Sequence, residues 1–220
     1  MAVRLLVFTL RMAADRPING SAAQLRGFFA NKFTEYHLLH QHAANGLIYD
    51  YPRVQYKIID GQHTIIGINE GAHVLKELYD QFDSLSIGST QYKVMNQEFD
   101  VKEHDFSLSD RLCSYVFKTP WIALNQHNYR AYHACNDNFE RRELLSRVLI
   151  GNILAIAKSF GYTVPQRINA TVEVRGRKVS LKKVSMLAFD GTFVVNFQIP
   201  DLLGLGKSVS RGYGTVLRSR

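Results

Sequence analysis

Segments with the periodicity of strands and of helices alternate along this chain, and the succession that starts the first half starts again in the second half. In the first half, Val3–Arg11 is apolar on both sides, as in a buried strand, and Asn19-Gly20-Ser21 signals a helix that we expect to end near Phe33. The pattern continues with a hairpin that turns at Asp60-Gly61, a helix over about Gly71–Phe82, and further extended segments. The first half therefore predicts the order strand, helix, strand, strand, helix, strand.

The second half restarts the pattern with a strand at Leu112–Phe117 and a long amphipathic helix over about Phe139–Phe160. Three strands are then expected, over Ile168–Val174, Val179–Phe189 and Phe193–Ile199. Turns at Arg175-Gly176-Arg177 and at Asp190-Gly191 are expected to separate them. This repetition predicts an α+β fold made of tandem ferredoxin-like (RRM-like βαββαβ) domains. We place the N-terminal domain at residues 1–107 and the C-terminal domain at residues 108–220.

Positive charge is concentrated in the second half. Residues 1–109 carry ten Lys and Arg against twelve Asp and Glu, a balance of −2, whereas residues 110–220 carry seventeen against seven, a balance of +10. This asymmetry favours a polyanionic partner, either nucleic acid or an anionic membrane surface. No segment approaches the roughly 18 apolar residues that a membrane span needs, and the first residues, MAVRLLVFTLR, are typical of a strand and not of a signal peptide.

The two cysteines, Cys113 and Cys135, do not have the spacing of a zinc ribbon or of a disulfide framework. We therefore expect a cytoplasmic protein with reduced thiols, without a metal or cofactor.

A glycine-rich, basic segment lies close to the end of the chain and reads GLGKSVSRGYG from Gly204 to Gly214. Glycine allows positive φ angles and a close approach of the backbone, so successive N–H groups can converge on phosphate oxygens. The candidate binding residues are Gly204, Gly206, Lys207, Ser208, Ser210, Arg211, Gly212 and Gly214. The spacing is that of neither a P-loop nor a Rossmann fingerprint, and the plain alternative is a glycine-rich turn between two strands.

The segment has the form G-h-G-x5-G-h-G, where h is hydrophobic, and resembles the signature loop of the RAMP superfamily. Within it, the chain resembles the endoribonucleases that cut CRISPR repeat transcripts (pre-crRNA) into guide RNAs, and YPRVQYK at Tyr51–Lys57 resembles their N-terminal domain. The resemblance extends over most of the chain. It implies a CRISPR repeat RNA as substrate and metal-independent cleavage by 2′-OH attack, which leaves a 2′,3′-cyclic phosphate and a 5′-OH. It leaves open whether the chain joins a CRISPR interference complex or forms a homodimer.

Three histidines, His37, His40 and His42, lie in the connection after the first expected helix. Imidazole ionises near neutral pH, so one histidine can take the proton from a 2′-OH and another can protonate the leaving 5′-oxygen. The resemblance places the catalytic histidine of the family in this connection. We expect His40 and His42 to be base and acid, in an order that the sequence does not assign, with Tyr49 as an orienting group. His37 is a further candidate that could instead end the helix, and all three could simply be solvated loop residues.

Neither the histidines nor a second group of titratable residues is expected to form a metal or carboxylate site. The HxH spacing of His40 and His42 also occurs in zinc sites, but no cysteine lies near and Glu35 is the only acidic residue between Asn31 and Asp50, so metal binding is not expected. A charge run in the middle of the chain is expected to be a solvated linker between the domains, and comprises Asp100, Glu103, His104 and Asp105.

Further basic residues lie on the expected hairpin of the second half, and are Arg175, Arg177, Lys178 and Lys182, followed by Lys183. They could follow an RNA backbone, or equally protect a sheet edge from aggregation. The stretch from His127 to His133, which includes Tyr129, Arg130 and Tyr132, could stack on bases, but a polar loop is the simpler interpretation.

Two other functions remain open on the sequence. The chain could be a non-catalytic RAMP subunit that holds guide RNA in a CRISPR interference complex, because the same glycine-rich segment would serve there. A small-molecule enzyme with a ferredoxin-like fold is less well supported, since no cofactor motif is present.

Overall fold

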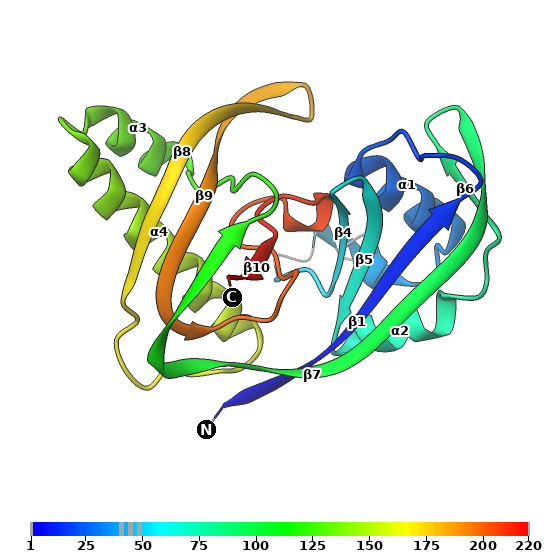
Figure 1. Ribbon diagram of the computed structural model, residues 1–220, viewed down its shortest axis with the longest axis horizontal. Coiled ribbons are helices and arrows are strands. Elements are labelled where there is room, and N and C mark those ends of the chain that lie inside the picture. The colour runs from blue at the N-terminus through cyan, green and yellow to red at the C-terminus, as the bar shows by residue number, and fades with distance from the viewer. Residues whose placement is uncertain (1, 40–41, 44–45, 48–49, 220) are drawn as a thin grey trace. The chain divides into compact units, whose positions relative to one another are not determined.

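The computed structural model describes residues 2–39, 42–43, 46–47 and 50–219, and it has the expected α+β architecture (Figure 1). The chain divides into two compact units. The N-terminal unit comprises Arg4–His104 together with Val209–Gly212. The C-terminal unit comprises Asp105–Ser208 and Tyr213–Arg220, with Met1–Val3. The predicted domain limits at residues 107 and 108 stay a prediction.

The N-terminal unit is a ferredoxin-like domain. Its sheet has the strand order β4-β5-β1-β7, with β6 also paired to β7. The elements are β1 (Val3–Ala14), α1 (Ala22–Lys32), the 3₁₀ turn η1 (His37–Leu39), β2 (His42–Ala43), β3 (Gly46–Leu47), β4 (Val54–Ile59), β5 (Gln62–Ile68), α2 (Glu70–Leu78), β6 (Ser84–Ile87) and the first part of β7 (Thr90–Phe117).

Local sequence accounts for the boundaries of these elements. Ser21 caps α1 in a capping box, in which its hydroxyl accepts from the Gln24 amide at 3.2 Å and its own amide donates to the Gln24 side chain at 2.8 Å. Asp60 and Gly61 have φ angles of 50° and 81°, the left-handed conformations of a tight hairpin turn, so β4 and β5 pair in register. Both expectations are confirmed.

The C-terminal unit has the same strand order with one helix replaced. Its elements are the second part of β7, α3 (Gln126–Ala134), α4 (Asn138–Ser159), β8 (Ala170–Leu181), β9 (Val184–Gln198) and β10 (Val216–Arg218). The sheet order is β10-β7-β9-β8, again ferredoxin-like. Between β9 and β10 a ferredoxin-like domain would hold its second helix, and this chain holds the glycine-rich segment there instead.

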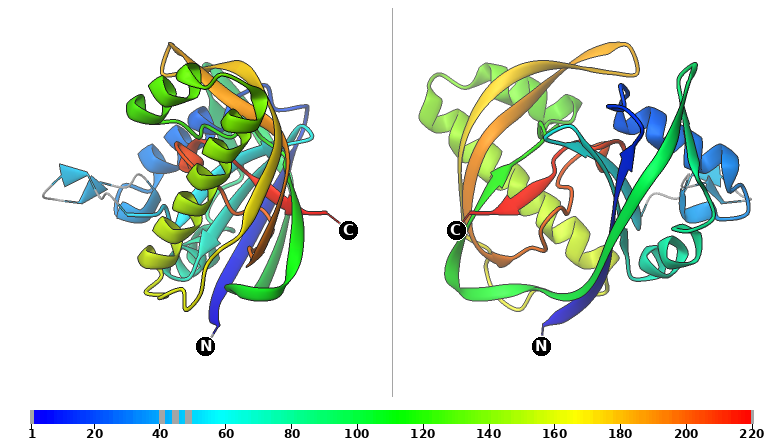
Figure 2. Two further views of the ribbon diagram at one scale, coloured as in Figure 1. Left: turned by 90° about the vertical axis from the view of Figure 1, so that its left-hand side faces the viewer. Right: turned by 45° about the vertical axis from the view of Figure 1, so that its right-hand side comes forward.

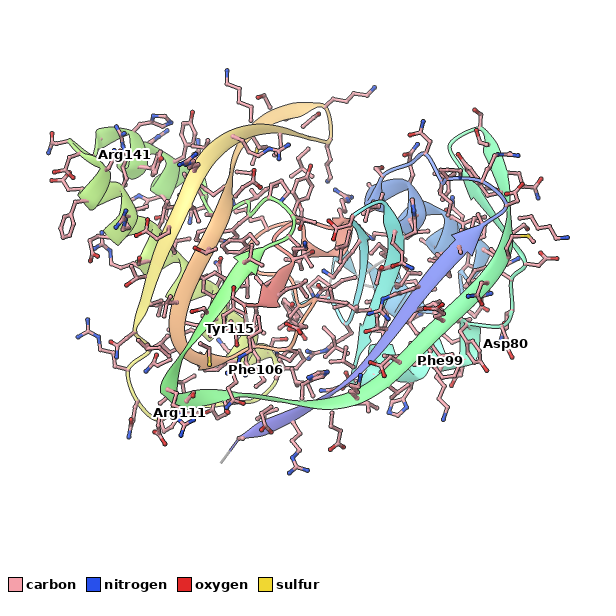
Figure 3. All side chains as sticks on the ribbon, in the orientation of Figure 1. Asp80, Phe99, Phe106, Arg111, Tyr115 and Arg141 are labelled. Carbon is pink, nitrogen blue, oxygen red and sulfur yellow. The ribbon has the colours of Figure 1, made fainter. Side chains whose placement is uncertain are left out.

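Helix α3 was not predicted, since the sequence favoured a polar loop there. None of its residues is buried, so it has no apolar stripe that a periodicity argument can detect. It starts at Asn125, whose side chain accepts from the Asn128 amide at 2.7 Å. The guanidinium of Arg141 on α4, labelled in Figure 3, lies 5.6 Å from the centroid of the Tyr132 ring, a cation–π contact that holds α3 against α4.

The two turns predicted within the second-half strands were wrong. β8 and β9 form one continuous hairpin (Figure 2) in which Arg175 pairs with Asp190 and Val174 with Gly191, so the two turn-like sequences lie opposite each other. Glycine at 191 allows close approach, since a Cβ there would lie 2.2 Å from the Glu173 carbonyl oxygen. The chain turns instead at Lys182 and Lys183, with φ angles of 52° and 66°.

The charge run predicted as a linker lies inside β7, a single strand of 28 residues. Lys102 pairs with Asp100 at 2.7 Å, and Arg4 on β1 pairs with Glu103 at 3.5 Å. From Asp100 to Asp105 no residue of the strand is buried, so charged side chains can point to both of its sides. Among the described helices, none combines the length and apolar character that a membrane span requires.

Candidate functional site

The two ends of the glycine-rich segment are held within the C-terminal unit by backbone hydrogen bonds. The amide of Leu205 donates to the carbonyl of Gly214 at 2.8 Å, and Gly204 forms a bridge with Thr215. The amide of Gly214 donates to Pro120 at 2.9 Å, and that of Lys207 donates to Ile122 at 3.0 Å. Both ends of the segment, at Gly204–Lys207 and at Gly214, are therefore held in place by the rest of the C-terminal unit.

Two of its glycines are required by close packing within the C-terminal unit. A Cβ on Gly206, where φ is 85°, would lie 2.7 Å from the Ile122 carbonyl oxygen and 2.7 Å from Trp121 Nε1. A Cβ on Gly214, where φ is 66°, would lie 1.9 Å from the Leu205 carbonyl oxygen. The amides of Leu205, Lys207, Gly212 and Gly214 all donate to carbonyls of the protein. These four amides therefore do not form the phosphate cradle that the sequence suggested.

The middle of the segment, Val209–Gly212, belongs to the N-terminal unit and contains the 3₁₀ turn η2 (Val209–Arg211). Gly212, where φ is 89°, lies so close to α1 and β4 that a Cβ would be 2.8 Å from the Ala22 Cβ and 3.1 Å from the Tyr56 carbonyl oxygen. Ser210 is buried, and the side chain of Arg211 remains half-buried. This close packing positions Arg211 beside helix α1.

Arg26 on α1 faces the charge of Arg211. Burial lowers the pKa of Arg26 first, and the positive charge of Arg211 lowers it further. Two guanidinium groups that repel each other at a partly buried position are stabilised by an anion placed between them. Sequence reasoning selected Arg211 but missed Arg26, because a single arginine in a helix of mixed polarity gives no signal of a site.

The connection that follows α1 begins from a fixed point in the same unit. Tyr56 on β4 is fully buried, and its hydroxyl donates to the carbonyl of Leu39, the last residue of η1, at 3.4 Å. Burial raises the pKa of Tyr56 far above its usual range. Tyr56 is therefore an anchor for the connection and not a proton donor in solution at neutral pH.

The predicted catalytic residues are only partly covered by the structure. His37 is exposed in η1. His40 and Tyr49 lie outside the described residues, and His42 is described only through the backbone pairing of β2 with β3. The connection ends in Asp50, whose carboxylate lies 3.5 Å from Arg53.

The basic hairpin is joined to the glycine-rich segment within the C-terminal unit. The hydroxyl of Tyr213 donates to the carbonyl of Ser180, near the end of β8, at 2.9 Å. Arg177 pairs with Asp190 at 3.1 Å, so part of its charge is neutralised. The other predicted hairpin residues are exposed, and are Arg175, Lys178 and Lys182.

Family models match both halves of the chain. The Cas6b C-terminal domain matches residues 107–219, and the Cas6b N-terminal domain matches residues 3–105. The chain belongs to the Cas6b family.

Solved structures support the same assignment. A crystal structure of Cas6b is 35% identical over 99% of this chain and 100% of its own, with a TM-score of 0.90. A crystal structure of a CRISPR RNA processing endoribonuclease Cas6b is 33% identical over 99% and 100%, with a TM-score of 0.79. The uncharacterized protein MJ0978 of Methanocaldococcus jannaschii is 38% identical over 135 residues, which are 61% of this chain and 91% of its own.

As a Cas6b protein, the chain has an N-terminal unit in which three features meet at one strand. β4 carries Tyr56, which holds the end of η1 through its hydroxyl and lies against Gly212 through its backbone. Helix α1, with Arg26, packs on the same strand through the contact of Phe29 with Tyr56, whose ring centroids are 5.8 Å apart. Sequence reasoning missed the role of Tyr56, because its aromatic ring is typical of any buried strand.

Proposed function

We propose that this Cas6b protein cleaves CRISPR repeat transcripts (pre-crRNA) into guide RNAs by 2′-OH attack, without a metal ion. The observation that carries the proposal is the attachment of two features to one strand. Tyr56 on β4 holds both the start of the histidine-bearing connection and the segment that presents Arg211. The similarity to a CRISPR RNA processing endoribonuclease supports the choice of substrate.

The proposed reaction needs a base, an acid and positive charge. One of His40 and His42 takes the proton of the 2′-OH, whose oxygen then attacks the adjacent phosphorus. The P–O5′ bond breaks, and the other histidine protonates the 5′-oxygen, so the products are a 2′,3′-cyclic phosphate and a 5′-OH. Tyr49 orients one of these groups, and His37 is the alternative proton carrier.

Arg211 and Arg26 are proposed to stabilise the negative charge of the pentacoordinate phosphorus. Both lie in the N-terminal unit, the unit that also carries the histidine-bearing connection. A preorganised pair of cations stabilises the transition state more than the substrate if the charge on the phosphate oxygens grows during the reaction.

The RNA strand is proposed to contact side chains more than backbone amides. Lys207 is exposed, and Ser208 has a strained positive φ of 58°, a conformation that is often retained at binding sites. The glycines Gly204, Gly206, Gly212 and Gly214 shape the segment, and the buried Ser210 supports it. On the hairpin, Arg175, Lys178 and Lys182 follow the phosphate backbone, with a smaller contribution from Arg177 because of its ion pair.

The protein is further proposed to act in the cytoplasm, as a homodimer or within a CRISPR interference complex. Light scattering of the purified chain, with and without repeat RNA, measures the first of these assemblies.

The test uses repeat RNA incubated with the wild-type protein and with His40→Ala, His42→Ala and the double variant, in EDTA. We expect each single variant to cleave at least about a hundredfold more slowly. An RNA with one 2′-deoxy nucleotide at the cut site should bind normally and remain intact. Undiminished cleavage by the double variant would exclude the proposed residues, and cleavage of the 2′-deoxy RNA would exclude the reaction.

A further inference from the structure

A cavity of about 540 Å³ lies within the C-terminal unit, between the start of α3, one face of α4 and the first residues of the glycine-rich segment. Its size lies within the range of small-molecule sites, which is roughly 300 to 1,000 Å³. Gly206 and Lys207 form its wall on the side of the segment. The backbone of Lys207 is fixed there by its hydrogen bond to Ile122.

The charges that line the cavity are positive. Arg147 on α4 and Lys207 are both exposed, and His127 on α3 lies with them. Among the described residues, none of the three has an ion-pair partner, and no aspartate or glutamate lines the cavity. Such a lining favours an anion.

The Oδ1 atoms of two asparagines in the wall each accept a hydrogen bond from the protein. The Oδ1 atom of Asn152 accepts from Trp121 Nε1 at 3.0 Å, and because an indole N–H only donates, this bond fixes the orientation of the amide. The Oδ1 atom of Asn125 accepts from the Asn128 amide at 2.7 Å. Each side chain therefore has its NH₂ group as a donor for a ligand, which favours a ligand that offers acceptors.

Gly151 indicates that the cavity is maintained at a cost to the helix. It lies inside α4 and lines the cavity, and a Cβ built on it would meet nothing within 4 Å. A glycine inside a helix costs about 1 kcal/mol relative to alanine. Packing therefore does not require this glycine, and a larger side chain at this position would take up space in the cavity.

We propose that this cavity binds one nucleotide of the RNA strand, with its phosphate at Arg147 and Lys207 and its acceptor atoms at the amides of Asn125 and Asn152. This inference rests on the proposed function, since the RNA is taken to reach Lys207 through the glycine-rich segment. A nucleotide combines the anionic charge and the multiple acceptors that the lining selects. The site is distinct from the residues proposed to carry the reaction.

Gly151→Leu tests the proposal, because a Cβ at this position meets nothing within 4 Å and the rest of the added side chain occupies space in the cavity. The matched control is Ala155→Leu, which adds the same side chain one turn further along α4, at an exposed position outside the cavity. Affinity is measured with repeat RNA that carries the 2′-deoxy block. We expect Gly151→Leu to weaken binding roughly tenfold and Ala155→Leu to leave it unchanged. Equal binding by the wild type and both variants would overturn the proposal.

A second pair of variants tests the charge. Arg147→Gln and Lys158→Gln each remove one cation from α4, but only Arg147 lines the cavity. We expect Arg147→Gln to reduce the slope of log affinity against log salt concentration by about 1, and Lys158→Gln to reduce it much less. Equal slopes would overturn the phosphate contact.

Titration with AMP distinguishes RNA from a free nucleotide. If Gly151→Leu abolishes AMP binding but leaves RNA affinity intact, the cavity is a site for free nucleotides and the assignment to the RNA strand is wrong. The proposed function fails separately, when the wild-type protein binds repeat RNA through this cavity but does not cleave it.

Discussion

The hydroxyl of Tyr56 donates a hydrogen bond to the carbonyl oxygen of Leu39, 3.4 Å away in the interior of the N-terminal unit. The carbonyl oxygen of Tyr56 itself would lie 3.1 Å from a Cβ on Gly212. One residue thus fixes the end of η1, from which the histidine-bearing connection departs, and the segment that presents Arg211. The position of the end of η1 relative to the segment that carries Arg211 therefore depends on their contacts with Tyr56 on β4.

Tyr56→Phe should therefore affect the reaction more than RNA binding. The variant loses one buried hydrogen bond, which costs about 1 kcal/mol of unfolding free energy. Because the carbonyl of Leu39 then loses a partner, we expect the cleavage rate at saturating RNA to fall several-fold while RNA affinity is retained. Urea unfolding and single-turnover cleavage measure the two effects.

The control for this variant is Tyr115→Phe in the C-terminal unit. Tyr115 (Figure 3) is also buried, and its hydroxyl donates to Phe197 at 3.2 Å and accepts from Ile199 at 2.8 Å. Because it loses two buried hydrogen bonds, this variant should lose at least as much stability as Tyr56→Phe, without a change in cleavage rate. Equal loss of rate in both variants would mean that only general stability is involved.

Arg26 and Arg211 are expected to contribute to RNA affinity and not to the stability of the free protein. Arg211→Gln removes a charge that repels Arg26, so we expect no decrease in the unfolding free energy of the free protein. RNA affinity should fall roughly five- to tenfold in Arg26→Gln and in Arg211→Gln. Lys76→Gln, which removes an exposed cation from α2, is the control. Similar loss of affinity in all three would show that net charge alone decides binding.

Gly212 allows a quantitative test of its close contact with α1 and β4. Gly61 has a similar φ angle, 81° against 89°, but a Cβ there would meet nothing within 4 Å. Gly61→Ala should cost about 1 kcal/mol of unfolding free energy because of the backbone conformation alone. Gly212→Ala adds the clash with Ala22 and should cost roughly 2 to 4 kcal/mol. Thermal or urea unfolding of both variants measures the difference, and equal losses would contradict the described contact.

Lys57 makes the stability of the fold depend on pH. The side chain is fully buried, its ammonium donates to Gln55 Oε1 at 3.0 Å, and burial lowers its pKa to about 7 from 10.5. Between these values the unfolded chain holds a proton that the folded chain has lost, so the unfolding free energy should rise with pH across this window. The destabilisation of the fold by this buried ammonium is largest below pH 7 and decreases as the pH rises toward 10.5.

Urea unfolding at pH 7 and pH 9 checks this sign, with Lys57→Met for comparison. The variant should be less dependent on pH than the wild type over this interval, because it cannot bind the proton. The same increase in stability in both proteins would assign the dependence to another group.

The sequence predicted those elements whose causes are local. The helix start at Ser21, the Asp60-Gly61 turn and the long apolar stripe of α4 each depend on a few neighbouring residues, and the structure has all three. The tandem ferredoxin-like fold follows from the order of these elements.

The remainder depends on contacts that are distant in sequence. Helix α3 buries none of its residues, and the hairpin turns at two lysines in a conformation that usually selects asparagine or glycine. The approach of Arg211 to Arg26 and the bond from Tyr56 to Leu39 exist only after the N-terminal unit has folded. No periodicity or motif in a single sequence encodes such pairs.

The central claim is that this protein breaks an RNA linkage with its own side chains by 2′-OH attack. Mass spectrometry of the products that form from repeat RNA in excess EDTA tests it most directly. We predict one upstream fragment that ends in a 2′,3′-cyclic phosphate and one downstream fragment with a 5′-OH. Fragments with a 3′-OH and a 5′-phosphate, or cleavage that requires added divalent metal, would contradict the account.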